Sequence, residues 1–115
     1  IMGDDTIRVN PTAVRVPVFY GHGEAIHVET YQPIDAQDVK TLLAAAPGIT
    51  VYPECDDFPT QVSSASGNDA VHVGRIRNDI SHPNGINLWV VSDNVRKGAA
   101  TNSVQIAEVL VRDYL

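Results

Sequence analysis

The sequence predicts an α+β domain in which one mixed or antiparallel sheet carries helices. Short runs of alternating or continuous apolar residues are typical of strands, a compact helix signal lies in the first half, and a helical apolar pattern ends the chain. These elements follow in the order ββαβββα. With 115 residues, 43% of them hydrophobic, the chain is long enough for one modest globular domain.

Two strands separated by a glycine-rich turn are expected first. Residues 13–20 are rich in β-branched and aromatic types, and Pro17 suggests that this strand is an edge strand or has a bulge. Two glycines flank His22 in the turn. Residues 24–31 alternate again and predict the second strand.

The next segment, "PIDAQDVKTLLAAAPG", predicts a helix with Asp35 as its N-cap and a Pro-Gly stop. A short strand is expected at 49–52 and a long polar loop at 53–69. Strands at 70–77 and 86–92 follow, joined by a turn-rich connection. The second of these, "INLWVVS", is almost entirely apolar and should be central in the sheet.

The last helix, residues 95–115, has an apolar surface wider than one face, with Asp93 or Asn94 near its cap. A five-stranded sheet that also packs against the first helix has little surface left to bury the apolar side of this last helix. The pattern therefore suggests that a second subunit, or a part of the protein outside this chain, packs against this helix.

Composition excludes several classes of partner. The formal net charge is -6 and no block of Lys or Arg interrupts it, so nucleic acid and anionic membranes are not expected as partners. No apolar run approaches the roughly 20 residues of a membrane span. Cys55 is the single cysteine, which excludes an internal disulfide and favours a cytoplasmic location. Its acidic neighbours favour a structural role over that of a nucleophile.

Arg15 and His22 are the main candidates for chemistry. An Arg can clamp a carboxylate or phosphate with two hydrogen bonds, and a glycine-flanked His can exchange protons near neutral pH. The alternatives are a solvated edge Arg and an ordinary turn His. Residues 15–22 would span about 23 Å if fully extended, so the chain must bend for both to reach one small substrate.

Other polar residues carry weaker signals. The remaining histidines, His27, His72 and His82, are scattered without a metal-binding motif, so no metal is expected. Arg75 and Arg77 share a strand face and should pair with acids across the sheet or at a subunit contact. The stretch "DNVRKGAAT" is either an anion or cofactor site or simply a capped helix.

Several strings together resemble the C-terminal part of bacterial aspartate-semialdehyde dehydrogenase. They are "NPTAVRVPVFYGHGEAIHVET", "FPTQV", "VGRIRNDI" and "INLWVVSDNVRKGAATNSVQIAEVLVRDYL", and the resemblance runs from about residue 9 to the end. It implies the catalytic and dimer-forming domain for residues 1–94. It also implies that residues 95–115 form a helix that docks on the nucleotide-binding domain.

The resemblance also implies a function. The family reduces aspartyl phosphate to aspartate 4-semialdehyde with NADPH, releasing phosphate, through a cysteine thioester, in lysine, threonine and methionine biosynthesis. By motif, Arg15 resembles the arginine that grips the substrate carboxylate, and His22 the acid/base. Asn94 resembles a residue that contacts the nicotinamide end of NADP. A cytoplasmic homodimer is expected.

Nothing in this sequence matches the family's nucleophilic cysteine or its nucleotide-binding glycine loop. The chain is therefore expected to be a fragment, inactive by itself. Two alternatives remain: a non-catalytic paralogue, and a stand-alone dimerisation module. The presence of Arg15, His22 and Asn94 together favours descent from the active enzyme over the paralogue.

Overall fold

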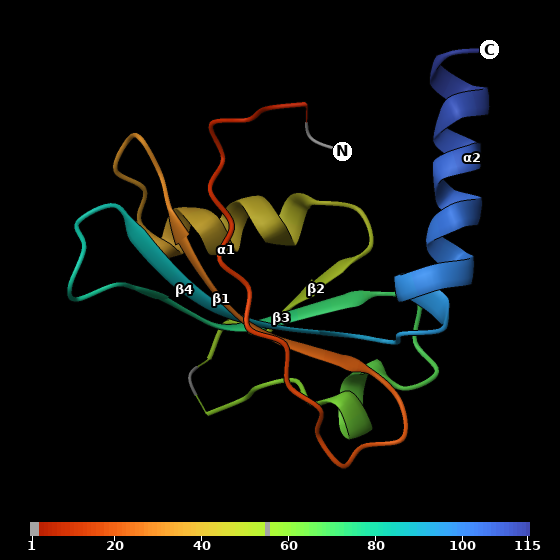
Figure 1. The fold of residues 1–115 in the computed structure, drawn as a ribbon, viewed down its shortest axis with the longest axis horizontal. Coiled ribbons are helices and arrows are strands. Elements are labelled where there is room, and N and C mark those ends of the chain that lie inside the picture. The colour runs from red at the N-terminus through yellow and green to blue at the C-terminus, as the bar shows by residue number, and fades with distance from the viewer. Residues whose placement is uncertain (1–2, 55) are drawn as a thin grey trace.

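The computed structural model describes residues 3–54 and 56–115, and shows a four-stranded sheet with helices (Figure 1). Cys55, predicted to be structural, lies outside the described residues. The strands and helices are β1 (His22–Glu29), α1 (Ala36–Ala45), β2 (Ile49–Val51), β3 (Val71–Asn78), β4 (Gly85–Ser92) and α2 (Thr101–Asp113). Two single π-helical turns lie at Gln61–Ala65 and Arg96–Ala100. The α+β class is confirmed, and the described residues form four strands where the sequence predicted five.

The sheet is mixed, and its strand order is β1-β4-β3-β2. β4 pairs antiparallel with both β1 and β3, whereas β2 pairs parallel with β3. β4 is therefore central, as its apolar sequence predicted. Because β1 and β4 are antiparallel, the start of β1 meets the end of β4 at one edge of the sheet.

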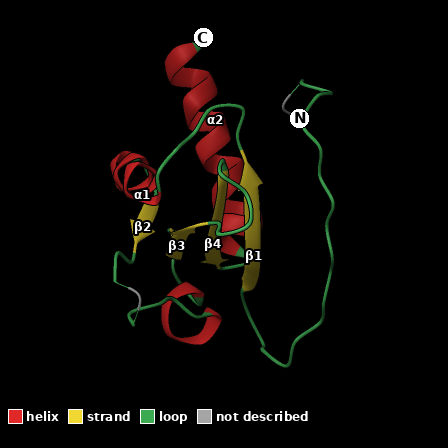
Figure 2. Ribbon diagram, turned by 90° about the vertical axis from the view of Figure 1, so that its left-hand side faces the viewer, coloured by secondary structure: helices red, strands yellow, loops and turns green. Residues whose placement is uncertain are grey.

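The predicted strand at 13–20 does not form, and that expectation was wrong. The backbone N–H of Val18 donates to the carbonyl of Val16 at 2.9 Å, which closes a tight turn centred on Pro17. Proline fixes its own backbone angle and has no N–H to give to a sheet. Figure 2 shows the segment before β1 running beyond β1 on the side away from α1, outside the sheet.

α1 covers one face of the sheet (Figure 2). Asp35 is its N-cap, as predicted, because its carboxylate accepts the N–H of Gln37 at 2.7 Å. The helix packs its apolar side against a small buried cluster from β3 and β4. The cluster consists of Val73, Ile76 and Ile86.

The opposite face is partly covered by the segment between β2 and β3, which was predicted to be a loop. Pro59 is fully buried against Gly74, where an alanine Cβ would lie 2.6 Å from the Pro59 ring. Trp89 donates its indole N–H to the Pro59 carbonyl at 2.9 Å. The following residues form the π-helical turn Gln61–Ala65, which contacts β1, β3 and β4.

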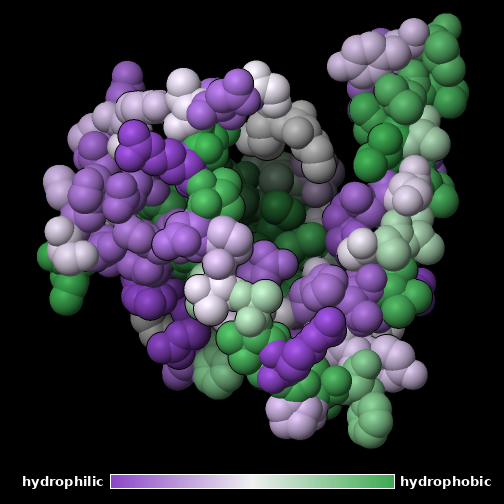
Figure 3. Space-filling view, in the orientation of Figure 1, coloured by the Kyte–Doolittle hydropathy of each residue, from purple (hydrophilic) through white to green (hydrophobic). Residues whose placement is uncertain are grey.

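α2 projects from the sheet and none of its residues is buried (Figure 1). Figure 3 shows apolar surface along this helix, and Val104, Ile106 and Val111 are each more than half exposed. The radius of gyration is 15.3 Å, compared with about 13 Å expected for a compact chain of this length. The helix at the end of the chain is confirmed, and no residue of the described chain buries its apolar surface.

Candidate functional site

His22 and Asn94 come together at the edge where β1 begins and β4 ends. The strand register places His22 directly opposite Ser92, so the residues after β4 lie beside the histidine. The Asn94 side-chain oxygen accepts the backbone N–H of Gly21 at 2.8 Å. The structure thus joins two of the three residues that the sequence singled out.

The ring of His22 lies against Gly98. An alanine Cβ at position 98 would lie 3.2 Å from Nε2 of His22, closer than ordinary van der Waals contact. The N–H of Gly98 donates to the carbonyl of Asp93 at 2.9 Å, which closes the turn after β4. The His22 side chain is otherwise exposed, so a substrate can reach its ring.

Gln61 lies against both glycines that flank His22. An alanine Cβ at position 21 would be 2.9 Å from Cβ of Gln61, and one at position 23 would be 2.3 Å from its Nε2. Gly21 also has a φ of +98°, in the region that favours glycine. Both glycines therefore allow the "FPTQV" segment to lie close to the start of β1. Sequence reasoning missed Gln61, although two glycines around one histidine were a signal of tight packing.

Asp93 is a second residue that sequence reasoning treated only as a helix cap. The residue is 5% exposed, and its side chain accepts three backbone N–H groups, from Gly67, Val95 and Arg96. These hydrogen bonds, the one from Arg96 first and that from Gly67 next, lower the pKa of the Asp93 carboxyl below its ordinary value. A buried carboxylate therefore lies next to Asn94 in the sequence and holds the turn in which Asn94 lies.

Arg15 is not joined to the other two residues. It lies in the irregular segment before β1, and its side chain is exposed. Within residues 3–54 and 56–115 it takes part in no hydrogen bond or ion pair. Between Arg15 and His22 the backbone turns at Pro17, and Gly21 has a positive φ.

Arg75 and Arg77 do not pair with an acid across the sheet, as far as the described residues show. The Arg75 guanidinium lies 5.7 Å from the ring centre of Phe58, and Arg77 donates to the Arg75 carbonyl at 2.9 Å. The register shifts between Gly74 and Arg77, and Arg75 has a φ of +54°. This bulge breaks the simple alternation on which the prediction rested.

The other histidines have separate surroundings. His27 lies 2.8 Å from the Asp79 carboxylate, and His72 is buried beside Tyr52. Within the part of the chain that the structure describes, no three His, Cys, Asp or Glu residues gather as a metal site would require. No described helix combines the length and the apolar character needed to cross a membrane.

The fold and site define a mixed-sheet α+β domain that presents a histidine and a carboxamide at one end of an antiparallel strand pair. Residues 1–97 match the family described as semialdehyde dehydrogenase, dimerisation domain. The chain belongs to this family, and the resemblance predicted from the motifs is confirmed.

Similar proteins agree with this assignment. The chain is 68% identical to aspartate-semialdehyde dehydrogenase of Shewanella violacea over 99% of this chain and 34% of that protein. A crystal structure of aspartate semialdehyde dehydrogenase II from Vibrio cholerae matches with a TM-score of 0.91 and 67% identity, over 97% of this chain and 33% of that one. A second structure of that enzyme, complexed with ASA, matches with a TM-score of 0.86 and 68% identity, over 92% of this chain and 31% of that one. The chain thus spans about a third of the length of these relatives.

Proposed function

We propose that this chain is the C-terminal part of an NADP-dependent aspartate-semialdehyde dehydrogenase. The reaction is the reductive dephosphorylation of aspartyl phosphate to aspartate 4-semialdehyde, with release of phosphate. The observation that carries the proposal is the pairing of His22 with the Asn94 segment at one sheet edge. The names of relatives at 67–68% identity support the same activity.

His22 serves as the acid/base of this reaction. An imidazole gains and loses a proton near neutral pH, which suits a group that activates a thiol and later handles a proton at the substrate. Gly98 lies against one part of the ring, which limits its rotation, while exposure of the side chain leaves it accessible to substrate. The ring is thus both held and reachable.

Asn94 fits the nicotinamide end of NADP. Its side-chain oxygen is committed to Gly21, whereas its side-chain NH2 group has no partner among the described residues. That NH2 group can donate to a carboxamide oxygen. When bound, NADPH would supply the hydride of the reaction, and Asn94 would bind and orient its carboxamide.

Arg15 binds the substrate carboxylate. A guanidinium offers two parallel donors that match a carboxylate, and Arg15 has its donors free of any other group within the described residues. The turn at Pro17 redirects the backbone between Arg15 and His22. This bend supports a shared substrate for two residues that an extended chain would keep apart.

The covalent step belongs to a cysteine elsewhere in the full-length protein. A thioester requires a thiolate nucleophile, and neither His22 nor Arg15 can replace it. We therefore expect the 115-residue chain alone to be inactive. The full-length enzyme would work in the cytoplasm, in the biosynthesis of lysine, threonine and methionine.

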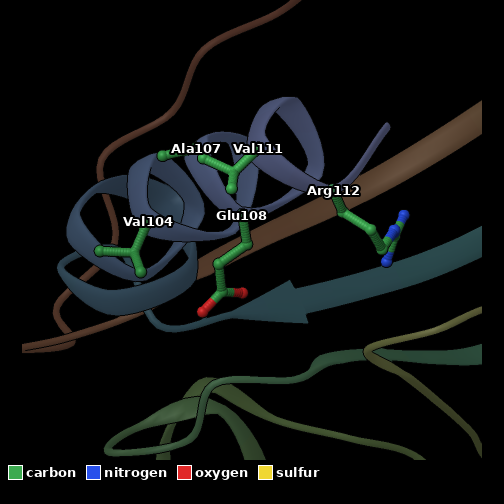
Figure 4. A pocket seen from close by; sticks show the side chains of 5 residues that line it. All are labelled: Val104, Ala107, Glu108, Val111 and Arg112. Carbon is green, nitrogen blue, oxygen red and sulfur yellow. The ribbon is translucent and has the colours of Figure 1, made fainter. Parts of the chain in front are cut away.

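Residues 1–94 form the catalytic and dimerisation domain, and residues 95–115 dock on the NADP-binding domain. The exposed apolar surface of α2 supports this division. Figure 4 shows a shallow pocket on this helix that only α2 residues line. These residues are Val104, Ala107, Glu108, Val111 and Arg112.

Homodimer formation uses the sheet face opposite α1. On this face a hollow of about 210 Å³ is lined by residues of β1, β3 and β4. Ala25, His27, Arg77 and Trp89 are among the residues that line it. Arg77 is exposed there, which leaves room for the subunit contact considered for this residue.

The proposal is tested in the full-length subunit by following NADPH formation from aspartate semialdehyde, phosphate and NADP. His22→Ala should lower kcat by roughly 10²–10⁴-fold, the usual contribution of a positioned acid/base. Arg15→Lys should mainly raise KM for the semialdehyde, by about tenfold or more, because one charge-assisted hydrogen bond is lost. The matched control is His82→Ala, since His82 lies on the turn between β3 and β4 at the far end of the sheet.

Full activity of the His22→Ala enzyme would refute the assignment. No activity in the wild-type subunit would favour the non-catalytic paralogue. Activity of the 115-residue chain by itself would contradict the expectation that the nucleophile lies elsewhere.

A further inference from the structure

The carboxylate of Asp93 joins two segments that are far apart in sequence. Its Oδ2 accepts the N–H of Gly67 at 2.8 Å. Its Oδ1 accepts the N–H of Val95 at 2.8 Å and that of Arg96 at 2.9 Å. The side chain of this buried residue thus links the end of the turn before β3 to the turn after β4.

Both linked segments contact the start of β1. The segment 61–67 places Gln61 against the two glycines that flank His22. The segment 93–98 holds the Gly21 N–H through Asn94 and places Gly98 against the His22 ring. The two segments, 61–67 and 93–98, therefore hold His22 in place, and the Asp93 carboxylate connects one segment to the other.

The chemistry of this link requires a carboxylate. An ionised Asp has two oxygens that only accept, so it can serve three donors on two sides. An amide has one oxygen, and its NH2 group would face the Gly67 N–H, donor against donor. An Asn at position 93 could keep Val95 and Arg96, but it would lose Gly67.

We propose that Asp93 is a positioning residue for the reaction, because its carboxylate connects the two segments, 61–67 and 93–98, that hold His22. This inference rests on the acid/base role proposed for His22. Asp93 does not touch the His22 ring; it acts through Asn94 and Gly98 on one side and through the Gln61 segment on the other. When the hydrogen bond to Gly67 is lost, segments 61–67 and 93–98 can move relative to each other while the sheet remains intact.

Asp93→Asn in the full-length enzyme tests the inference. We expect kcat to fall by about 10- to 100-fold with KM for aspartate semialdehyde nearly unchanged, because a misplacement of about 1 Å is enough for such a loss. Asp93→Ser is the second variant. Asn and Ser both cap helix starts well, so each variant keeps the turn after β4. Thermal unfolding verifies that the variants are folded.

NMR spectra report on the surroundings of His22 independently of activity. In Asp93→Asn, the amides of Gly21 and Gly98 should shift in ¹H–¹⁵N spectra, and the ring protons of His22 should shift in ¹H–¹³C spectra. Unchanged Gly21, Gly98 and His22 signals, or wild-type kcat in both variants, would overturn the inference.

Asp69→Asn is the matched control. Asp69 is exposed, and its carboxylate accepts hydrogen bonds from Arg96 and Thr101 of the same region. Because it has no link to Gly67, this variant should keep kcat within about twofold, as expected for an exposed ion pair. A loss equal to that of Asp93→Asn would also overturn the inference. If His22→Ala keeps activity, the proposed function fails, and the spectra still decide whether Asp93 positions the ring.

Discussion

Gly74→Ala should destabilise the sheet where the "FPTQV" segment covers it. An alanine Cβ at this position would lie 2.6 Å from Cδ of Pro59, whereas carbon atoms in contact lie at about 3.5–4.0 Å. Something must therefore move by about 1 Å. Pro59 cannot rotate away, because its ring is part of the backbone and its carbonyl accepts the Trp89 indole N–H at 2.9 Å.

The magnitude follows from two opposing effects. Overpacking of this kind costs about 1–3 kcal/mol, and replacing a strand glycine by alanine returns roughly 0.5–1 kcal/mol through backbone entropy. We expect a net loss of about 0.5–2 kcal/mol of unfolding free energy. For 115 residues the unfolding entropy is about 0.24 kcal/mol/K, so the midpoint should fall by about 2–8 °C.

The assay is thermal and urea unfolding of the wild type, both single variants and the double variant with Pro59→Ala. Removing the Pro59 ring eliminates the overlap, so the double variant should be more stable than the sum of the single effects by about 1 kcal/mol. Strict additivity, or a Gly74→Ala midpoint equal to that of the wild type, would refute the reasoning.

Three further predictions concern stability. Asp35→Ala should cost about 0.5–2 kcal/mol in urea unfolding, because the N-cap of α1 is lost. Burial lowers the pKa of His72 from its ordinary 6.5, so the unfolded chain binds its proton more readily. Stability should therefore fall as pH drops below about 6.5, and less so in His72→Leu, as urea unfolding at pH 7.5 and 5.5 would reveal. Val104→Ser with Val111→Ser should change stability by less than about 0.5 kcal/mol, because both side chains are exposed; a larger loss would mean that α2 is packed.

The sequence predicted best those elements whose signals are local. Asp35 capped its helix because its side chain bonds a neighbour two residues away. The apolar run of β4 placed it at the centre because only a strand with two partners avoids water on both edges. The strand at 13–20 failed because Pro17 forms its own turn, and this outweighed the β-branched composition around it.

The site could be predicted only in part. The motif resemblance singled out His22 and Asn94, and the structure brings them together. Asn94 accepts the N–H of Gly21, the residue before His22, and this proximity depends on the antiparallel register, which places His22 opposite Ser92. Gln61 was not singled out, and Asp93 was recognised only as a helix cap. Gln61 contacts glycines about 40 positions away and Asp93 binds Gly67 26 positions away, and no local pattern records such contacts. Arg15 stays a prediction, since its side chain has no partner among the described residues.

The distances in sequence also explain why the site depends on the whole sheet. The segments at 21–23, 61–67 and 93–98 belong to no common local unit, and only the β1–β4–β3 pairing places them at one edge. Two of them carry glycines where a larger residue would collide with another segment. Close approach of backbones, rather than a large buried core, therefore holds His22 in place. Each such contact depends on the strands being in register, so the geometry of the candidate site depends on the correct pairing of the sheet.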